Sequence, residues 1–138
     1  MSIVQTEWWC LELPQEWQAE MADDCVSISD CDEISFLDIS AIKKQGASVA
    51  EEDLLDLSDD LLQQKIPYQS VTVASLRGIS FVYDDRDEGV AWREWYLAQD
   101  DLLLYITYNT DLENKGLDDA VVDEILATLL VLPDTPDA

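Results

Sequence analysis

The sequence contains no histidine among its 138 residues, which removes the commonest general base, the usual serine or cysteine triad and most zinc sites. It also lacks the G-x-S-x-G motif of serine hydrolases and the glycine-rich loops that hold phosphates. We therefore expect neither triad chemistry nor nucleotide chemistry.

The 31 aspartate and glutamate side chains are the remaining groups that could carry acid and base chemistry. Spacing alone selects no pair, and Glu94 is the best single candidate because strand alternation places it between Trp92 and Tyr96. Apolar neighbours there would disfavour a charged carboxylate. The alternatives are that Arg93 or another cation pairs with Glu94, or that Glu94 faces solvent. A carboxylate-dependent enzyme is one hypothesis that this residue supports.

A second acidic group, residues 84–88, lies in a predicted turn and offers the oxygen atoms that hard cations prefer. It does not match the D-x-[DN]-x-[DN]-G-x5-E calcium loop, because Gly89 is misplaced and no glutamate follows at the required spacing. Such turns are usually just solvated. We predict no dedicated metal site and no cofactor. The candidate binding residues are Asp84, Asp85, Asp87, Glu88, Trp92, Glu94 and Tyr96.

These candidates precede or lie within the strongest fold signal, residues 92–108, which predicts two strands joined by a polar turn at 99–101. Residues 92–97 alternate with aromatic side chains on both faces. Residues 102–108 are almost wholly apolar, which is typical of a strand buried on both faces near the centre of a sheet. A hairpin alone is marginal in water, so further strands and a helix must pack on it.

The rest of the chain supplies those elements. Additional strands are predicted at 7–13, 19–22, 25–29, 34–41, 68–76 and 79–83, with Gly78 as a turn between the last two. The side chains expected to face the core are Trp9, Leu11, Leu13, Val26, Ile28, Leu37 and Ile39. Ser48 and Glu51 have the spacing of a capping box, which predicts a helix as far as Gln64, and Ser58 could start a second helix inside it. Another helix is predicted to begin near Asp118.

The length and net charge of the chain limit its domain organisation and its possible partners. A chain of 138 residues suits one domain, 1–138, with a frayed tail at 133–138. The net charge of −24 is spread along the chain, repels nucleic acid and anionic membranes, and attracts basic proteins. We expect the fold to tolerate this charge in salt and to weaken when salt is removed.

The cysteines and the N-terminus predict a soluble, cytoplasmic protein. Cys10, Cys25 and Cys31 are odd in number, which favours reduced, buried thiols over a bridge between Cys25 and Cys31. No basic residue precedes Lys43, so we expect no signal peptide, and no apolar run approaches the about 20 residues that span a bilayer.

The opening W-x-L-x-L-P-x-x-W consists of Trp9, Leu11, Leu13, Pro14 and Trp17. A meander, a helix after K-K-Q-G, the strands WREWYL and ITY and a closing I-L-x-x-L helix follow it. This order resembles the Mog/PsbP-like group across nearly the whole chain. The resemblance implies an antiparallel sheet sandwiched by helices, and members that mainly bind proteins, among them a Ran-binding import factor and a photosystem subunit. The group also includes bacterial proteins of no assigned role, and no shared functional motif carries residues over.

The expected fold is therefore α+β, a mostly antiparallel sheet of about six strands packed with two principal helices. The first functional hypothesis is a non-catalytic, acidic protein-binding module, for example an immunity or inhibitor protein for a basic toxin or nuclease, or a DNA mimic. The second is acidity as an adaptation to high salt, with a small-molecule pocket between sheet and helix. Acids concentrated on one face would favour the first hypothesis, and evenly spread acids the second.

Overall fold

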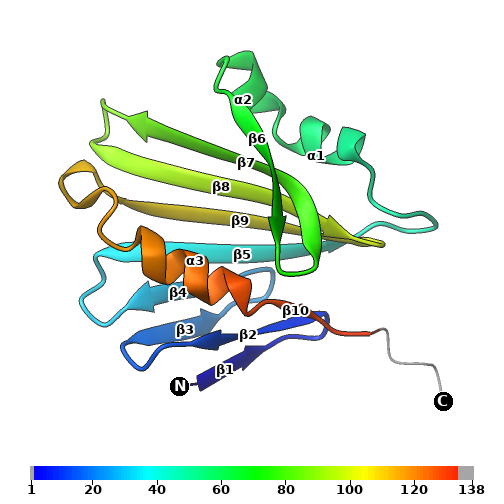
Figure 1. Ribbon diagram of the computed structural model, residues 1–138, viewed down its shortest axis with the longest axis horizontal. Coiled ribbons are helices and arrows are strands. Elements are labelled where there is room, and N and C mark those ends of the chain that lie inside the picture. The colour runs from blue at the N-terminus through cyan, green and yellow to red at the C-terminus, as the bar shows by residue number, and fades with distance from the viewer. Residues whose placement is uncertain (1, 134–138) are drawn as a thin grey trace.

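The computed structural model describes residues 2–133, which form two antiparallel sheets and three α-helices (Figure 1). The strands are β1 Ser2–Gln5, β2 Trp9–Leu13, β3 Trp17–Met21, β4 Val26–Asp30, β5 Ser35–Lys43, β6 Tyr68–Val73, β7 Leu76–Asp85, β8 Val90–Gln99, β9 Leu102–Asp111 and β10 Leu130–Val131. The helices are α1 Glu51–Leu57, α2 Asp59–Gln63 and α3 Asp119–Ala127, with a 3-10 turn, η1, at Leu112–Asn114. The α+β class is confirmed, with more strands than the sequence predicts. Apart from Pro133, the predicted frayed tail lies outside the described residues.

The larger sheet has seven strands in the order β3-β4-β5-β9-β8-β7-β6, and the smaller has three in the order β1-β2-β10. Every neighbouring pair is antiparallel. Strand β9 lies at the centre of the larger sheet, as its apolar sequence predicts. Within residues 2–133, no helix is long and apolar enough to cross a membrane.

The central hairpin confirms the strongest prediction. Gln99 pairs with Leu102, so Asp100 and Asp101 alone make the turn, and Asp100 takes a φ of 53° that aspartate tolerates. Leu103 and Leu104, which point to opposite faces of β9, are both buried. The sheet therefore needs a hydrophobic layer on each side of this strand.

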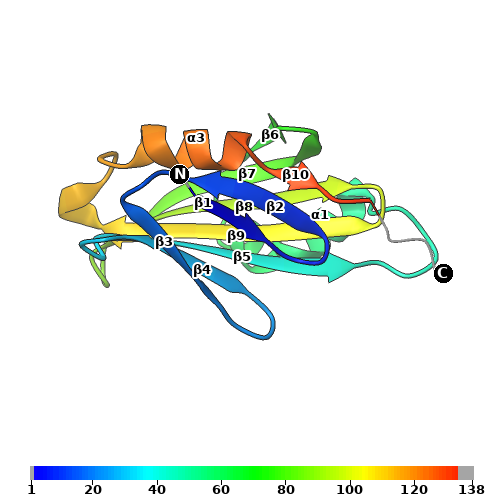
Figure 2. The same ribbon diagram turned by 90° about the horizontal axis from the view of Figure 1, so that it is seen from below.

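The two faces of the larger sheet are covered differently. On one face lie the three-stranded sheet and α3, whose Val122, Ile125 and Leu126 join one hydrophobic core with strands β4, β5, β8 and β9 (Figure 2). All of the predicted core side chains are buried there: Trp9, Leu11, Leu13, Val26, Ile28, Leu37 and Ile39. On the other face, Leu54 of α1 and Leu61 of α2 pack against Phe81, Tyr96 and neighbouring side chains of β7 to β9.

The start of α1 differs from the capping-box prediction. Ala50 is the N-cap residue, and Asp53 accepts the Ala50 N–H at 2.8 Å, so Ser48 lies before the helix and is not its cap. The predicted break at Ser58 is confirmed. The Ser58 hydroxyl donates to the Leu54 carbonyl at 2.9 Å, and such local bonding competes with the regular helix.

Gly78 is not a turn residue, because the turn between β6 and β7 falls at Ala74 and Ser75. Gly78 lies inside β7, where a Cβ atom would stand 1.9 Å from the Tyr96 carbonyl oxygen. The glycine therefore serves a close approach of two backbones.

The cysteines form no disulfide in the described part of the chain. Cys10 and Cys25 are half-buried, but the predicted burial is wrong for Cys31. Cys31 is exposed because it lies beyond the end of β4, in the turn toward β5.

Candidate functional site

Helices α1 and α2 cover only the β7 and β8 side of their sheet face. On that same face, opposite α3, no helix of residues 2–133 covers β4, β5 and the adjoining half of β9 (Figure 2). Antiparallel register shows which side chains share this face of the sheet, from its uncovered part on β4 and β5 to its border with the helices on β8 and β7, since directly paired residues point to the same side. One row across the strands consists of Ser27, Asp38, Thr107 and Glu94. The next row consists of Ser29, Phe36, Asn109, Trp92 and Tyr83. We call these two rows, with Tyr105 of β9 beside them, the open face.

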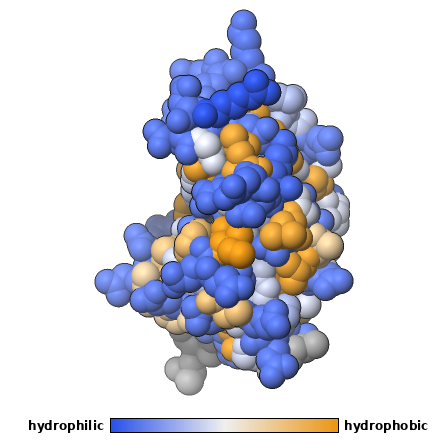
Figure 3. Space-filling view, turned by 90° about the vertical axis from the view of Figure 1, so that its left-hand side faces the viewer, coloured by the Kyte–Doolittle hydropathy of each residue, from blue (hydrophilic) through white to orange (hydrophobic). Residues whose placement is uncertain are grey.

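The aromatic part of the open face lies toward the end of the sheet where β7 ends and β8 begins. Phe36 is 40% exposed, and Trp92 stacks on Tyr83 with ring centres 6.3 Å apart and planes 12° from parallel. Stacking holds the half-buried indole in one orientation. Figure 3 views this end of the sheet and shows hydrophobic side chains gathered in the middle of a mostly hydrophilic surface. Separately from that patch, rigid aromatic rings such as those of Phe36 and Trp92 act as anchors in protein interfaces.

Glu94 belongs to the first row of the open face by register, but its side chain is buried, with 5% of the residue's surface exposed. Three tyrosine hydroxyls donate to its carboxylate: Tyr96 at 2.7 Å, Tyr105 at 3.1 Å and Tyr83. Tyr96 shares β8 with Glu94 through local alternation, whereas Tyr105 of β9 and Tyr83 of β7 reach it only through cross-strand packing. Hydrogen bonds to several donors are what allows a carboxylate to stay buried.

The tyrosines of this cluster are held in their neutral form. Burial, and then the hydrogen bond to the Glu94 carboxylate, raises the pKa of Tyr83 and of Tyr96 far above the ordinary value. Burial and the nearby Glu94 charge also raise the pKa of Tyr105. Neutral phenols can only donate to Glu94 here, which makes the cluster a hydrogen-bonded structural unit.

Arg93 does not pair with Glu94, because alternation along β8 points it to the opposite face. Its guanidinium lies 4.6 Å from the centre of the Trp95 ring, and its Nη2 atom lies 2.7 Å from Asp123 Oδ1. A longer contact of 3.5 Å reaches Asp119. Arg93 therefore joins α3 to β8 and takes no part in the open face.

Comparison with known proteins identifies the fold. No family model and no curated protein matches this chain. A crystal structure from Bacteroides thetaiotaomicron VPI-5482 matches 92% of it at 16% identity with a TM-score of 0.66, although the chain spans only 46% of that protein. The solution structure of the cyanobacterial PsbP protein CyanoP from Synechocystis sp. PCC 6803 matches 95% of this chain and 92% of its own, at 9% identity and a TM-score of 0.63. The chain has the Mog/PsbP-like fold.

A third structure shares it. LpqN, which is involved in cell envelope biogenesis of Mycobacterium tuberculosis, aligns over 96% of this chain and 85% of its own with 14% identity and a TM-score of 0.57. Identities this low establish a common Mog/PsbP-like architecture, while function has to be argued from the side chains of this chain.

The Mog/PsbP-like fold separates the predicted binding residues. Trp92 lies half-buried on the open face, whereas Glu94 is buried in its row and Tyr96 is buried beneath α1 and α2. Asp84 binds Lys115 with 2.8 Å between Nζ and Oδ2, and Asp85 accepts the Glu88 N–H at 3.1 Å. Asp87 and Glu88 are exposed in the turn. Residues 2–133 contain no group of three or more side chains placed to hold a metal ion.

Sequence reasoning missed several members of the open face. Two of them, Phe36 and Asp38, could have been predicted from the alternation of side chains along β5. Because Leu37 and Ile39 face the core, the residues between and before them must face the other side. Tyr83, Tyr105 and Thr107 gave no such signal, since their proximity to Glu94 depends on the register of three strands.

Proposed function

We propose that the protein is a non-catalytic binding module that docks a basic protein partner on its open face. The supporting observation is a sheet surface that presents the exposed ring of Phe36 and the stacked ring of Trp92 beside the carboxylate of Asp38. The Glu94 carboxylate is buried and hydrogen-bonded within the protein, so it holds this surface in place and does not contact a partner. The two rows that define this surface include no lysine or arginine. Aromatic anchors supply contact area, and surrounding acids steer and select a positively charged surface.

The rest of the molecule strengthens the electrostatic part of this proposal. A net charge of −24 attracts basic proteins from a distance and repels nucleic acids and anionic membranes. The sharpest version is an immunity or inhibitor protein for a basic toxin or nuclease, acting in the cytoplasm, where free thiols persist. The Mog/PsbP-like group, whose members mainly bind proteins, fits the same role.

A carboxylate-dependent enzyme fits the geometry less well. Glu94 accepts three tyrosine hydroxyls, and Asp38 lies on β5, two strands or about 10 Å away across the sheet. The surface between them is an open sheet carrying Thr107, and neither the cleft at α1 nor the one at the turn before β2 includes Glu94. Acid and base catalysis requires a substrate held against the carboxylates, which an open hydroxyl-bearing sheet does not provide.

Acidity as an adaptation to salt is the second candidate. Its supporting observation is that acidic side chains also occupy surfaces outside the open face. They include Asp23 and Asp24 in the turn after β3, Glu51 and Glu52 in the first turn of α1, and Glu124 on α3. Under this hypothesis the acids serve solubility, and removing one from the open face would not change which proteins bind.

Affinity capture with paired variants tests the proposal. Wild-type protein on beads should retain a basic protein from a lysate of the source organism in stoichiometric amount and release it as salt is raised. Phe36→Ala combined with Asp38→Asn should lose that protein. The control, Leu117→Ala combined with Glu124→Gln, removes one exposed apolar side chain and one charge elsewhere and should retain it. Equal capture by both variants, or empty beads at every salt concentration, would refute docking on the open face.

A further inference from the structure

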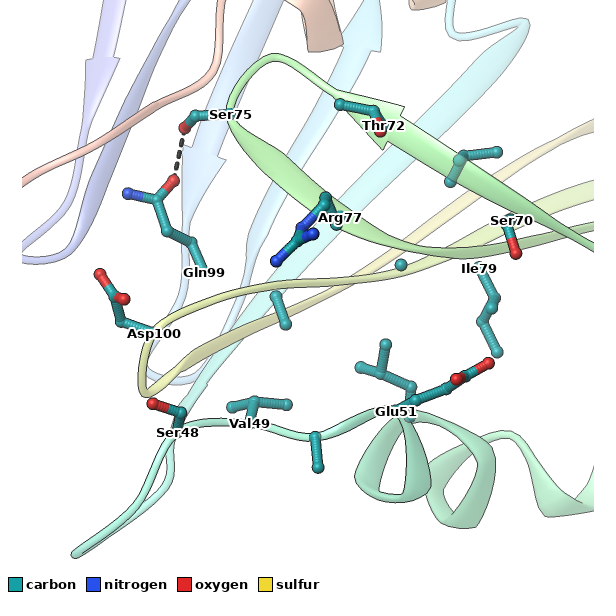
Figure 4. A pocket seen from close by; sticks show the side chains of 15 residues that line it. Ser48, Val49, Glu51, Ser70, Thr72, Ser75, Arg77, Ile79, Gln99 and Asp100 are labelled. Carbon is teal, nitrogen blue, oxygen red and sulfur yellow. Dashed lines mark hydrogen bonds between the residues drawn. The ribbon is translucent and has the colours of Figure 1, made fainter.

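A cleft of about 750 Å³ lies beside α1, at the end of the sheet where β6 turns into β7 and β8 turns into β9 (Figure 4). Its size is within the range of small-molecule sites in proteins. Val49, Leu54, Ile79 and Ala98 give it an apolar wall. Its charged lining consists of Glu51, Arg77 and Asp100, and serine, threonine and glutamine side chains complete the polar part. None of these side chains belongs to the open face.

The walls of the cleft are held by hydrogen bonds within the protein. The Val49 N–H donates to the Asp100 carbonyl at 2.7 Å, and the Lys44 N–H donates to the Asp101 carbonyl at 2.8 Å. These bonds fasten the segment before α1 to the turn between β8 and β9. At the opposite rim, the Ser75 hydroxyl donates to Gln99 and joins the β6–β7 turn to β8 (Figure 4). The cleft is thus formed before any ligand arrives, which lowers the entropic cost of binding.

Arg77 is the central polar group of the cleft. Figure 4 shows its guanidinium pointing into the space between Asp100 on one side and Glu51 on the other. The Arg77 side chain forms no ion pair or hydrogen bond with any residue in 2–133, although the chain has 31 acidic and only 7 basic side chains. Lys44, Arg93 and Lys115 bind aspartates, whereas the side chains of Lys65 and Arg86, like that of Arg77, have no such partner among residues 2–133. Arg77 differs from Lys65 and Arg86 because it lines the cleft. An arginine left without a partner in so acidic a protein has its fork of donors free for a carboxylate ligand.

The charges in the lining restrict the ligand. Glu51 and Asp100 leave the cleft with one more negative than positive side chain, so a phosphate or another multiply charged anion would be repelled. A ligand that matches both signs carries one carboxylate for Arg77 and one ammonium group for Glu51 or Asp100. We propose that this cleft binds a small zwitterion, a free amino acid whose apolar side chain packs on Val49, Leu54 and Ile79.

Titration of the isotope-labelled protein, followed through its backbone amide NMR signals, tests the site. The probes are the standard amino acids added singly at millimolar concentration. We expect an apolar one such as L-leucine to shift the signals of Ser48, Ser70, Ala98 and Asp100 and to saturate. Its analogues 4-methylpentanoate, which lacks the amino group, and 3-methylbutylamine, which lacks the carboxyl group, should each bind about tenfold more weakly or worse.

The matched variants are Arg77→Gln and Arg86→Gln. Each substitution removes one positive charge from an exposed arginine. Arg77 lies near the start of β7, at the cleft, whereas Arg86 follows the other end of that strand and does not line the cleft. Arg77→Gln should weaken binding about tenfold or more, and Arg86→Gln should leave it unchanged. Three results would overturn the proposal: no amino acid shifts the cleft signals, the two variants bind equally, or 4-methylpentanoate binds as tightly as L-leucine.

Discussion

The hydroxyl oxygen of Tyr96 lies 2.7 Å from Oε1 of Glu94, two residues earlier on the same face of β8. One member of this pair is a buried carboxylate and the other is a buried phenol whose only charged form is negative. They can coexist only while the phenol keeps its proton and donates it. Tyr83 and Tyr105 repeat this relationship from the two neighbouring strands.

Removing one donor from this cluster should destabilise the protein. In Tyr96→Phe the Glu94 carboxylate loses a hydrogen bond at a site that water does not reach, and we expect a loss of about 1.5–3 kcal/mol in the free energy of unfolding, measured with urea. Tyr68→Phe is the control, because Tyr68 also packs its ring on Phe81 but is 41% exposed. Equal effects of the two substitutions would show that the bond to Glu94 contributes nothing.

Alkaline pH should unfold the protein through the phenols of the Glu94 cluster and of Tyr108. The pKa values of Tyr83, Tyr96, Tyr105 and Tyr108 are raised in the folded state, with burial as the first cause in each. Above about pH 10 the unfolded chain releases these protons while the folded chain retains them, so the stability present below that pH falls as pH rises. Phenolate absorbance should therefore rise together with the loss of circular dichroism. Phenolate formation by all four tyrosines near pH 10 in a still folded protein would contradict this.

Desalting should lower the melting temperature. The surface of 8444 Å² carries a net charge of −24, or about 350 Å² for each net negative charge, which corresponds to a spacing of about 19 Å. Screening extends over about 8 Å at physiological salt but about 30 Å at 0.01 M, so neighbouring charges repel only in dilute buffer. The measurement is calorimetry over a salt series, with sucrose as a control for nonspecific stabilisation. A melting temperature that is independent of salt would show that repulsion is unimportant.

Gly78 should not tolerate alanine. The added Cβ would stand 1.9 Å from the Tyr96 carbonyl oxygen, and because the clashing atom belongs to the backbone, we expect a cost of about 3 kcal/mol or more. Gly89→Ala is the comparison: Gly89 has a φ of 70° in open space, so only its backbone strain of about 1 kcal/mol should appear. Urea unfolding of both variants gives the difference, and similar losses would place Gly78 among ordinary strand residues.

Much of the fold could be predicted because local patterns report on it directly. Alternation of Trp9, Leu11 and Leu13 shows which side of β2 is buried, and the apolar run in β9 shows that this strand is central. The start of α1 was misplaced because Ser48 and Glu51 have the spacing of a capping box without its geometry. Gly78 was misread because a glycine in a strand and a glycine in a turn look alike until the neighbouring strand is present.

The sequence by itself determined the acidic character of this protein, the absence of histidine chemistry, and the side of its strand on which Glu94 lies. Tertiary structure decided which groups meet there. Tyr83 and Tyr105 are each 11 residues from Glu94 and reach it from different strands, and Arg77 shares its cleft with Glu51 of a helix. The physical reason is that the two-residue period of a strand determines which face of the sheet a side chain lies on. Its neighbours on that face depend on strand register and helix packing, which are set by turn lengths and by contacts between distant segments.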